Sequence, residues 1–413
     1  MAKLRFEGSL ALRLRGFMIL SGLAVRTRLN HLLGRRLDPS WDADFETGIR
    51  FWRRQFTRAM SGTGMARGRQ ILDSVQTETD DVYPVRTVAS AEPRGRWYEP
   101  DARKTDAVAL YLHGGGYAFH SAISRRFAAM LAHHGGIRLF APDYRLTPEH
   151  PHPAQQEDAL AAWDYVTSRT APDRVVVIGD SAGGHMALML LQSLKRAGRE
   201  QPALCVGLCP WTDIGARGDS LHSNDRYDLV QGWMALRFGE MLDPDGTYGR
   251  EALSPINHDF AGLAPLYLQA GGREVLRDMI LDFATVQAGN GADVMLDLWP
   301  DMPHDFQAYD SLRQSSREAL SRIRKALEAR FGDASLARAA LMTPQELLDL
   351  PGVGRASLSR LIVELSGEAP MTVPELVTGT GKAEFNLVPV GRDRIETLMG
   401  LRSVMRGAPP SLA

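Results

Sequence analysis

The stretch RVVVIGDSAGGHMALMLLQSL, residues 174–194, decides the fold. A run of β-branched residues, typical of a buried strand, leads into a glycine-rich turn and then into apolar residues at helical spacing. A serine on so sharp a turn has a strained backbone, so the residues two before and two after it must be small. Gly179 and Gly183 meet that need. This context predicts that Ser181 is a nucleophile, whereas the glycine pattern alone would be weak evidence.

A second glycine run, HGGGY at residues 113–117, directly follows the apolar run AVALYL. Acyl transfer places negative charge on a carbonyl oxygen, and converging backbone amides stabilise that charge. We therefore predict an oxyanion hole made by the amides of Gly114, Gly115 and Ala182. The alternative is a flexible turn without a chemical role. It is disfavoured because both halves of one mechanism occur here in the right order.

The general base is expected in a loop after the last strand, where LWPDMPHDF supplies His304. The acid is expected between nucleophile and base, and APLYLQAGGREVLRDM offers Glu274 and Asp278. Glu274 is closer to the strand, where a carboxylate would orient the imidazole. Asp278, about one helical turn further on, is interpreted as a cap or salt-bridge residue and stays open as the alternative acid. The predicted catalytic set is Ser181, Glu274 and His304.

The surrounding sequence predicts an α/β fold with a mostly parallel sheet covered on both faces, because short apolar runs alternate with helical patterns. Six strands are expected at AVALYLH, RLFAPDY, RVVVIGD, ALCVGLCP, APLYLQAG and DVMLDLWP. Two more, RTVAS and RGRWYEP, precede them as an antiparallel start, which gives eight strands. A charged amphipathic helix, residues 311–331, closes this unit.

The bulk composition excludes little. The 413 residues carry a net charge of −1, so there is no global attraction to nucleic acid or acidic membranes. Cys205 and Cys209 share one face of an expected strand, which indicates packed thiols rather than a zinc site. Cysteine usage favours a reducing compartment, and we expect a cytoplasmic protein. Neither a metal site nor a turn that would cradle a phosphate or dinucleotide cofactor is predicted.

The first 36 residues are strongly basic, since eight lysines and arginines face a single acid, Glu7. The apolar stretch between them, residues 17–25, is too short for a transmembrane helix. We favour an amphipathic helix lying over the rest of the protein. Peripheral membrane contact stays open, because basic amphipathic helices serve both purposes. The basic residues are Lys3, Arg5, Arg13, Arg15, Arg26, Arg28, Arg35 and Arg36.

Taken together, the motifs HGGGY, DYRLTPEHPHPAQQEDA, GDSAGG, GREVLRD and MPHDF resemble the hormone-sensitive-lipase-like family of esterases. The resemblance implies an α/β-hydrolase fold with an N-terminal helical cap, supplied by WDADFETGIRFWRRQF. It also implies hydrolysis of a small-molecule ester with a short to medium acyl group, through an acyl-enzyme. Glu274 stands where that family often has an aspartate. A lactonase or amidase would share this machinery, and a catalytically silent scaffold is a third reading.

We expect three segments: a basic helix and cap helices at 1–60, a catalytic domain at 61–332, and a small all-α domain at 335–413. In the last, LMTPQELLDLPGVGRASLSRLIVEL resembles helix-hairpin-helix modules, whose hairpin amides, here around Gly352 and Gly354, bind phosphate oxygens. Pro389 takes the place of the first hairpin glycine in a second copy, and acidic residues dilute the positive field. A packing or protein-contact role is therefore favoured over nucleic-acid binding. Homo-oligomer formation stays open.

Overall fold

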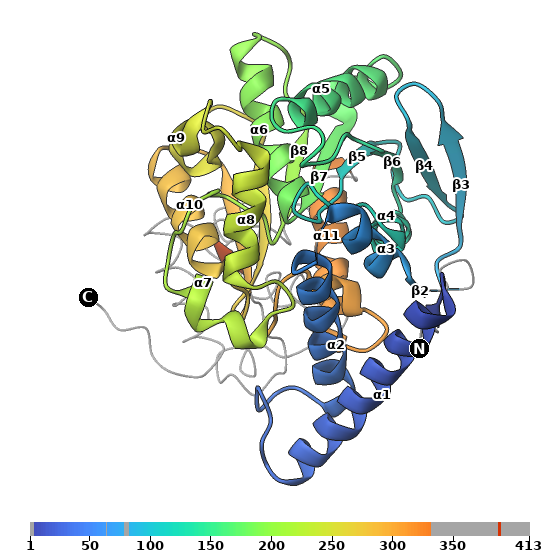
Figure 1. Ribbon diagram of the computed structural model, residues 1–413. Helices are drawn as coiled ribbons and strands as arrows, with labels where there is room; N and C mark the ends of the chain where they lie inside the picture. The colour runs from blue at the N-terminus through green and yellow to red at the C-terminus, as the bar shows by residue number, and fades with distance from the viewer. Residues whose placement is uncertain (1–3, 63, 78–81, 332–386, 390–413) are drawn as a thin grey trace, which may run out of the picture.

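The computed structural model describes residues 4–62, 64–77, 82–331 and 387–389. Its centre is a sheet with the strand order β11-β10-β9-β8-β7-β5-β6-β4-β3 (Figure 1). The pairs between β6 and β10 are parallel, whereas β3, β4 and β11 pair antiparallel with their neighbours. The strands are β3 (Val85–Ser90), β4 (Gly95–Pro100), β5 (Val108–Leu112), β6 (Arg138–Pro142), β7 (Val175–Asp180), β8 (Leu204–Leu208), β9 (Leu266–Gly271), β10 (Val294–Trp299) and β11 (Leu387–Pro389).

Helices cover both faces of the sheet. Helices α5 (Ala154–Thr167), α6 (Ala182–Arg196) and α10 (Arg277–Gly289) pack on one face, and α4 (Ala122–Gly135) and α11 (Gln314–Phe331) pack on the other. Further helices lie between β8 and β9: α7 (Ser220–Ser223), α8 (Gly232–Leu242) and α9 (Gly249–Leu253).

The side chains of β5 show why the strands of this sheet appear in the sequence as continuous apolar runs. Val108, Leu110 and Leu112 pack in the core on the α5 and α6 side, whereas Ala109 and Tyr111 pack in the core under α4 and α11. All five are buried, as expected for a parallel strand covered on both faces. The loops that follow the strands are therefore anchored to a sheet that has a packed core on each face.

All eight strands expected from the sequence are present, and the antiparallel start is confirmed by the pairing of β3 with β4 and of β4 with β6. Cys205 lies in β8, and Cys209 follows it directly. Both thiols are free and buried, as predicted. The eight-stranded, mostly parallel core predicted for the catalytic unit is thus the observed one.

The N-terminal region forms three helices and a small ladder between β1 (Leu4–Phe6) and β2 (Val75–Thr77). The helices are α1 (Leu10–Leu32), α2 (Ala43–Met60) and α3 (Met65–Asp73). The segment expected to form the cap corresponds to α2, and α1 runs along the outside of α2 (Figure 1). Among the described residues, no helix combines the length and apolar character needed to cross a membrane.

Three residues of the C-terminal segment are described, and they are extended. Leu387–Pro389 forms β11, which pairs antiparallel with β10 at the edge of the sheet. The prediction of an all-α segment over 335–413 is therefore wrong at these three residues. Proline is tolerated at a sheet edge because a missing amide matters least there. The rest of the expected helix-hairpin-helix segment, with Gly352 and Gly354, lies outside the described residues, and its role stays a prediction.

Candidate active site

Ser181 occupies the turn between β7 and α6, with φ 54° and ψ −119°. This is the left-handed side of backbone space, which L-residues rarely adopt. A side chain at Gly179 would collide with the backbone of Gly183, and one at Gly183 would collide with the backbone of Leu112. The Ser181 amide donates to the carbonyl of Leu208 at 2.9 Å, which anchors the turn to β8. The sequence expectation of a strained turn flanked by obligatory glycines is confirmed.

The glycine run after β5 faces the same turn, but its amides divide between two tasks. The Gly114 amide donates to Oδ1 of Asp180 at 2.9 Å, so it is already used within the protein. Gly115 and Gly116 have φ values of 106° and 62°, and both line a cavity together with Ser181 and Ala182. The hydrogen bond to Asp180 contradicts the prediction that the Gly114 amide is available to an oxyanion. Three consecutive glycines give no sequence signal for which amides turn inward.

Asp180 and Tyr144 hold this glycine run in place through hydrogen bonds. Oδ1 of Asp180 also accepts a hydrogen bond from the Tyr111 hydroxyl at 2.6 Å, and burial raises the pKa of Asp180 to about 6. The Tyr144 hydroxyl donates to the carbonyl of His113 at 2.6 Å. The segment around Tyr144 thus supports the glycine turn. The sequence did not indicate that Asp180 would do so as well.

His304 follows β10, and its Nδ1 lies 2.7 Å from Oε2 of Glu274. Both side chains are buried. The other oxygen, Oε1, accepts a hydrogen bond from the Gly271 amide at 2.6 Å, which fixes the carboxylate. Burial alone would lower the pKa of His304, but the carboxylates of Asp305 and Glu274 outweigh it and raise that pKa to about 10. The predicted acid and base are therefore in direct contact.

Asp278, the alternative acid, lies elsewhere. Its Oδ2 accepts a hydrogen bond from the Ser220 amide at 2.8 Å, and its Oδ1 is 2.7 Å from Arg277. It lies in the first turn of α10 and forms the salt bridge that the sequence suggested, and it accepts its backbone hydrogen bond from the first residue of α7. Of the two candidate acids, Glu274 is the one in contact with His304.

Asp228 is a site residue that the sequence did not indicate. It is fully buried, and its Oδ1 accepts hydrogen bonds from the amides of His304 at 3.1 Å and Leu229 at 2.7 Å. Its Oδ2 accepts one from the Val275 amide at 2.7 Å. One carboxyl group therefore joins the loop of the base to the loop of the acid. A lone aspartate between two short helices carries no motif, so only the tertiary structure could reveal it.

This chain is similar to several known proteins. A family described by its α/β-hydrolase fold matches residues 109–308. An acetyl-hydrolase from Streptomyces hygroscopicus is 35% identical over 244 residues, which is 58% of this chain and 81% of that protein. The chain belongs to the α/β-hydrolase fold family. It is a carboxylesterase- or lipase-like hydrolase of carboxylic esters.

Two further matches agree with this α/β-hydrolase assignment. The carboxylesterase NlhH from Mycobacterium tuberculosis is 28% identical over 255 residues, or 56% of this chain and 78% of that protein. A solved structure of an esterase from the bacterial hormone-sensitive lipase family is 28% identical, with a TM-score of 0.59 over 76% of this chain and 98% of that one.

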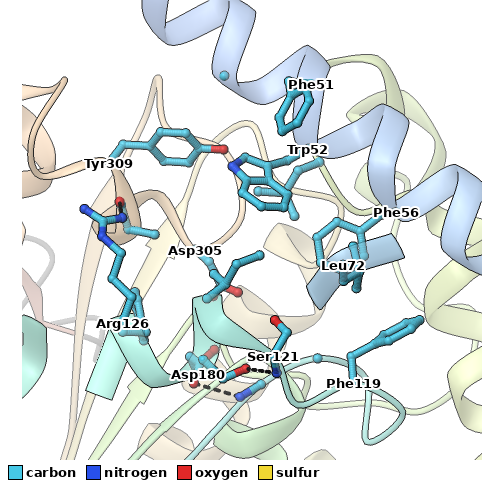
Figure 2. Close-up of a pocket in the computed structure, with 18 of the residues that line it drawn as sticks. Phe51, Trp52, Phe56, Leu72, Phe119, Ser121, Arg126, Asp180, Asp305 and Tyr309 are labelled. Carbon is cyan, nitrogen blue, oxygen red and sulfur yellow. Dashed lines mark hydrogen bonds between the residues drawn. The ribbon is translucent and has the colours of Figure 1, made fainter. Parts of the chain in front are cut away.

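Two adjoining cavities lie at this site of the α/β-hydrolase. The smaller, about 40 Å³, is lined by both Ser181 and His304. The larger, about 230 Å³, is walled by aromatic side chains of α2 and by Phe119 (Figure 2). Phe56 and Asp305 line both. The α2 aromatics are Phe51, Trp52 and Phe56. A mainly apolar space therefore opens beside Ser181.

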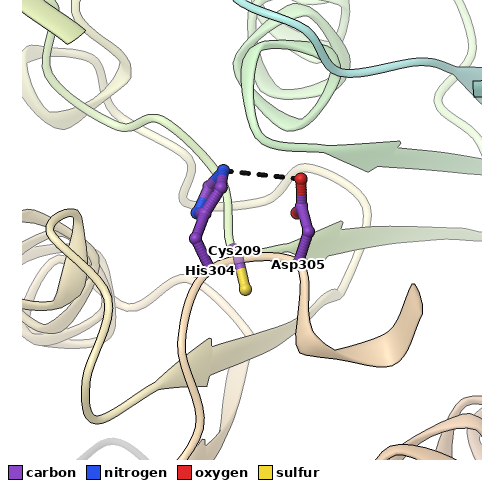
Figure 3. Close-up of side chains that lie close together, drawn as sticks. All are labelled: Cys209, His304 and Asp305. Atoms are coloured by element: carbon purple, nitrogen blue, oxygen red, sulfur yellow. Dashed lines mark ion pairs between the residues drawn. The ribbon is translucent and has the colours of Figure 1, made fainter. Parts of the chain in front are cut away.

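Asp305 brings a second carboxylate to the base. Its Oδ2 lies 3.5 Å from Nε2 of His304, and its backbone has φ 50° (Figure 3). Burial raises the pKa of Asp305, and the positive charge of His304 opposes that rise. Cys209 is the third member of this cluster. Burial raises the pKa of its thiol and so keeps it protonated, and Nδ1 of His304 is committed to Glu274. The cluster therefore suits proton chemistry better than metal binding.

Proposed function

We propose that the protein is a serine carboxylic ester hydrolase that works through Ser181, His304 and Glu274 and forms an acyl-enzyme. One observation carries the proposal: His304 bonds Glu274 through Nδ1 at 2.7 Å and lines one cavity together with Ser181. Glu274 would fix the orientation of the imidazole and stabilise its charged form.

In the first half-reaction, the Ser181 hydroxyl oxygen attacks the ester carbonyl carbon while Nε2 of His304 takes the hydroxyl proton. The carbonyl oxygen becomes negatively charged, and the amides of Gly115, Gly116 and Ala182 would donate to it. The bond to the alcohol oxygen then breaks, and His304 returns the proton to that oxygen. An alcohol leaves, and the acyl group stays on Ser181.

In the second half-reaction, water takes the place of serine. His304 accepts a proton from the water as it attacks the acyl carbon, and then gives that proton to the Ser181 oxygen as the carboxylic acid leaves. Every proton that moves passes through one nitrogen, Nε2, and neither a cofactor nor a metal is needed. The apolar cavity beside Phe56 would take a short to medium acyl or alcohol chain.

Hydrolysis of p-nitrophenyl acetate and butyrate by the wild type and by Ser181→Ala tests the proposal. We expect the variant to lose roughly a thousandfold or more in kcat/KM, because the acyl-enzyme cannot form. Equal rates for the two proteins on every ester would refute it. The same pair, assayed on a lactone and an anilide of matching chain length, would show whether lactonase or amidase activity exceeds esterase activity.

A further inference from the structure

Helix α1 exposes many apolar side chains on one side. At roughly 100° of rotation per residue, seven of them fall within an arc of about 120°, which we call the outer face. Each is more than half exposed, from 52% at Leu14 to 84% at Leu32. The outer face consists of Leu10, Leu14, Phe17, Met18, Val25, Leu29 and Leu32.

The opposite side of α1 is what fixes the helix to the protein. Leu12, Gly16 and Thr27 are buried there, and α1 packs along α2. Near the C-terminal end, His31 Nε2 lies 2.8 Å from Glu46 of α2, and Arg28 pairs with Asp44 at 3.0 Å. Arg28 itself falls within the arc of the outer face, yet the seven apolar side chains of that face stay more than half exposed. Contiguous apolar surface left over after folding marks an interaction site.

Charge indicates what this surface meets. Arg13, Arg15 and Arg26 are exposed and flank the outer face at its two borders. In the described part of the chain, none of the three forms an ion pair. Arginine can place its methylene groups along an apolar surface and keep its guanidinium at the level of phosphate groups. An apolar stripe bordered by arginines is the pattern of a helix lying in a membrane interface.

We propose that the outer face of α1 docks on an anionic lipid surface. Its apolar side chains would enter the boundary between headgroups and acyl chains, and the three arginines would meet lipid phosphates. A second copy of this chain fits the face less well. A two-fold contact places the same patch on itself, so it would bring these arginines together without acidic partners.

The position of α1 connects such docking to the hydrolase. Leu20, on the inner side of α1, and Leu4 of β1 line the larger cavity together with Gly114 and Gly115. Only the thickness of one helix, about 10 Å, would separate the lipid from that end of the cavity. An apolar ester dissolved in the membrane would therefore reside next to the site that hydrolyses it.

Co-sedimentation of the full chain with extruded vesicles tests the proposal. We expect binding to vesicles of equal parts phosphatidylcholine and phosphatidylglycerol, weak binding to phosphatidylcholine alone, and release by salt. Phe17→Glu with Met18→Glu should abolish sedimentation. Replacing Arg13, Arg15 and Arg26 by Gln should weaken binding by about fivefold per arginine. Trp233→Glu, at an exposed apolar residue of α8, is the matched control and should bind like the wild type.

Two results would overturn the proposal. One is that the wild type fails to co-sediment with anionic vesicles, or that the Phe17→Glu, Met18→Glu variant co-sediments with them equally well. The other is that sedimentation equilibrium finds a dimer that this variant dissociates, with no vesicle binding, which would assign the face to a second copy. Hydrolysis of soluble p-nitrophenyl butyrate is measured for every variant. Unchanged rates show that the fold is intact and keep this result separate from the proposed chemistry.

Discussion

Nε2 of His304 lies 3.5 Å from Oδ2 of Asp305, the next residue in the chain. The nitrogen that we propose to accept the Ser181 proton therefore has a carboxyl group beside it. Whether His304 can act as the base at a given pH depends on which of these two groups holds the proton.

The pH profile should depend on Asp305. The neighbouring carboxylates raise the pKa of His304 to about 10, which favours the imidazolium, and an imidazolium cannot act as the base. Activity should thus rise with pH through that pKa. Asp305→Asn removes one carboxylate, lowers the pKa of His304, and should move the acidic limb of kcat/KM down by about one unit or more. Asp245→Asn, on the surface, should leave the profile unmoved. A limb that stays in place in both variants would contradict the coupling.

The two candidate acids should separate by kinetics. Glu274→Gln loses the charge that stabilises the imidazolium, and we expect kcat to fall by roughly a thousandfold or more, with partial recovery in Glu274→Asp. Asp278→Asn should keep kcat within a few-fold and lose about 1 kcal/mol in the free energy of unfolding, because only a helix end is affected. Steady-state kinetics and urea titration measure both. Comparable losses of kcat in the two variants would argue against Glu274.

Asp228 should act as a positioning residue. Asn in its place turns one acceptor into a donor that faces backbone amides, so we expect a loss of about 1–3 kcal/mol in stability. The loops of Glu274 and His304 would also shift, and kcat should fall more than KM rises. Urea unfolding gives the first quantity and steady-state kinetics the second. A variant that loses stability yet keeps kcat would limit Asp228 to a structural role.

Acyl preference should follow the wall of the larger cavity. Phe56→Ala enlarges both cavities, so the ratio of kcat/KM for p-nitrophenyl octanoate to that for the acetate should rise. Each additional buried methylene is worth about 0.8 kcal/mol, or roughly fourfold. Tyr248→Ala, whose side chain lines neither cavity, serves as the control. Identical ratios in the wild type and Phe56→Ala would remove Phe56 from the substrate pocket.

Local patterns in the sequence were enough for the parts of the site that depend on the backbone. The turn at Ser181 needs small neighbours, and a buried parallel strand needs a continuous apolar run, so both could be predicted from adjacent residues. His304 and Glu274 followed from their places after consecutive strands. Their contact at 2.7 Å agrees with that reasoning.

The parts that escaped prediction depend on tertiary contacts. Gly114 and Gly116 are equivalent in sequence, and only the bond from Gly114 to Asp180 tells their amides apart. Asp228 lies 47 residues from Val275 and 76 from His304, so no local pattern could join them. The exposure of the outer face of α1 likewise depends on which side of the helix α2 covers.

Seven of the residues that line the larger cavity lie in β1, α1, α2 and α3, all before the main sheet begins, whereas Ser181, Glu274 and His304 follow strands of that sheet. Part of the cavity lining is thus encoded separately from the residues proposed for bond cleavage. Exchanging this first stretch between related enzymes would change that part of the lining and leave the loops of the sheet in place.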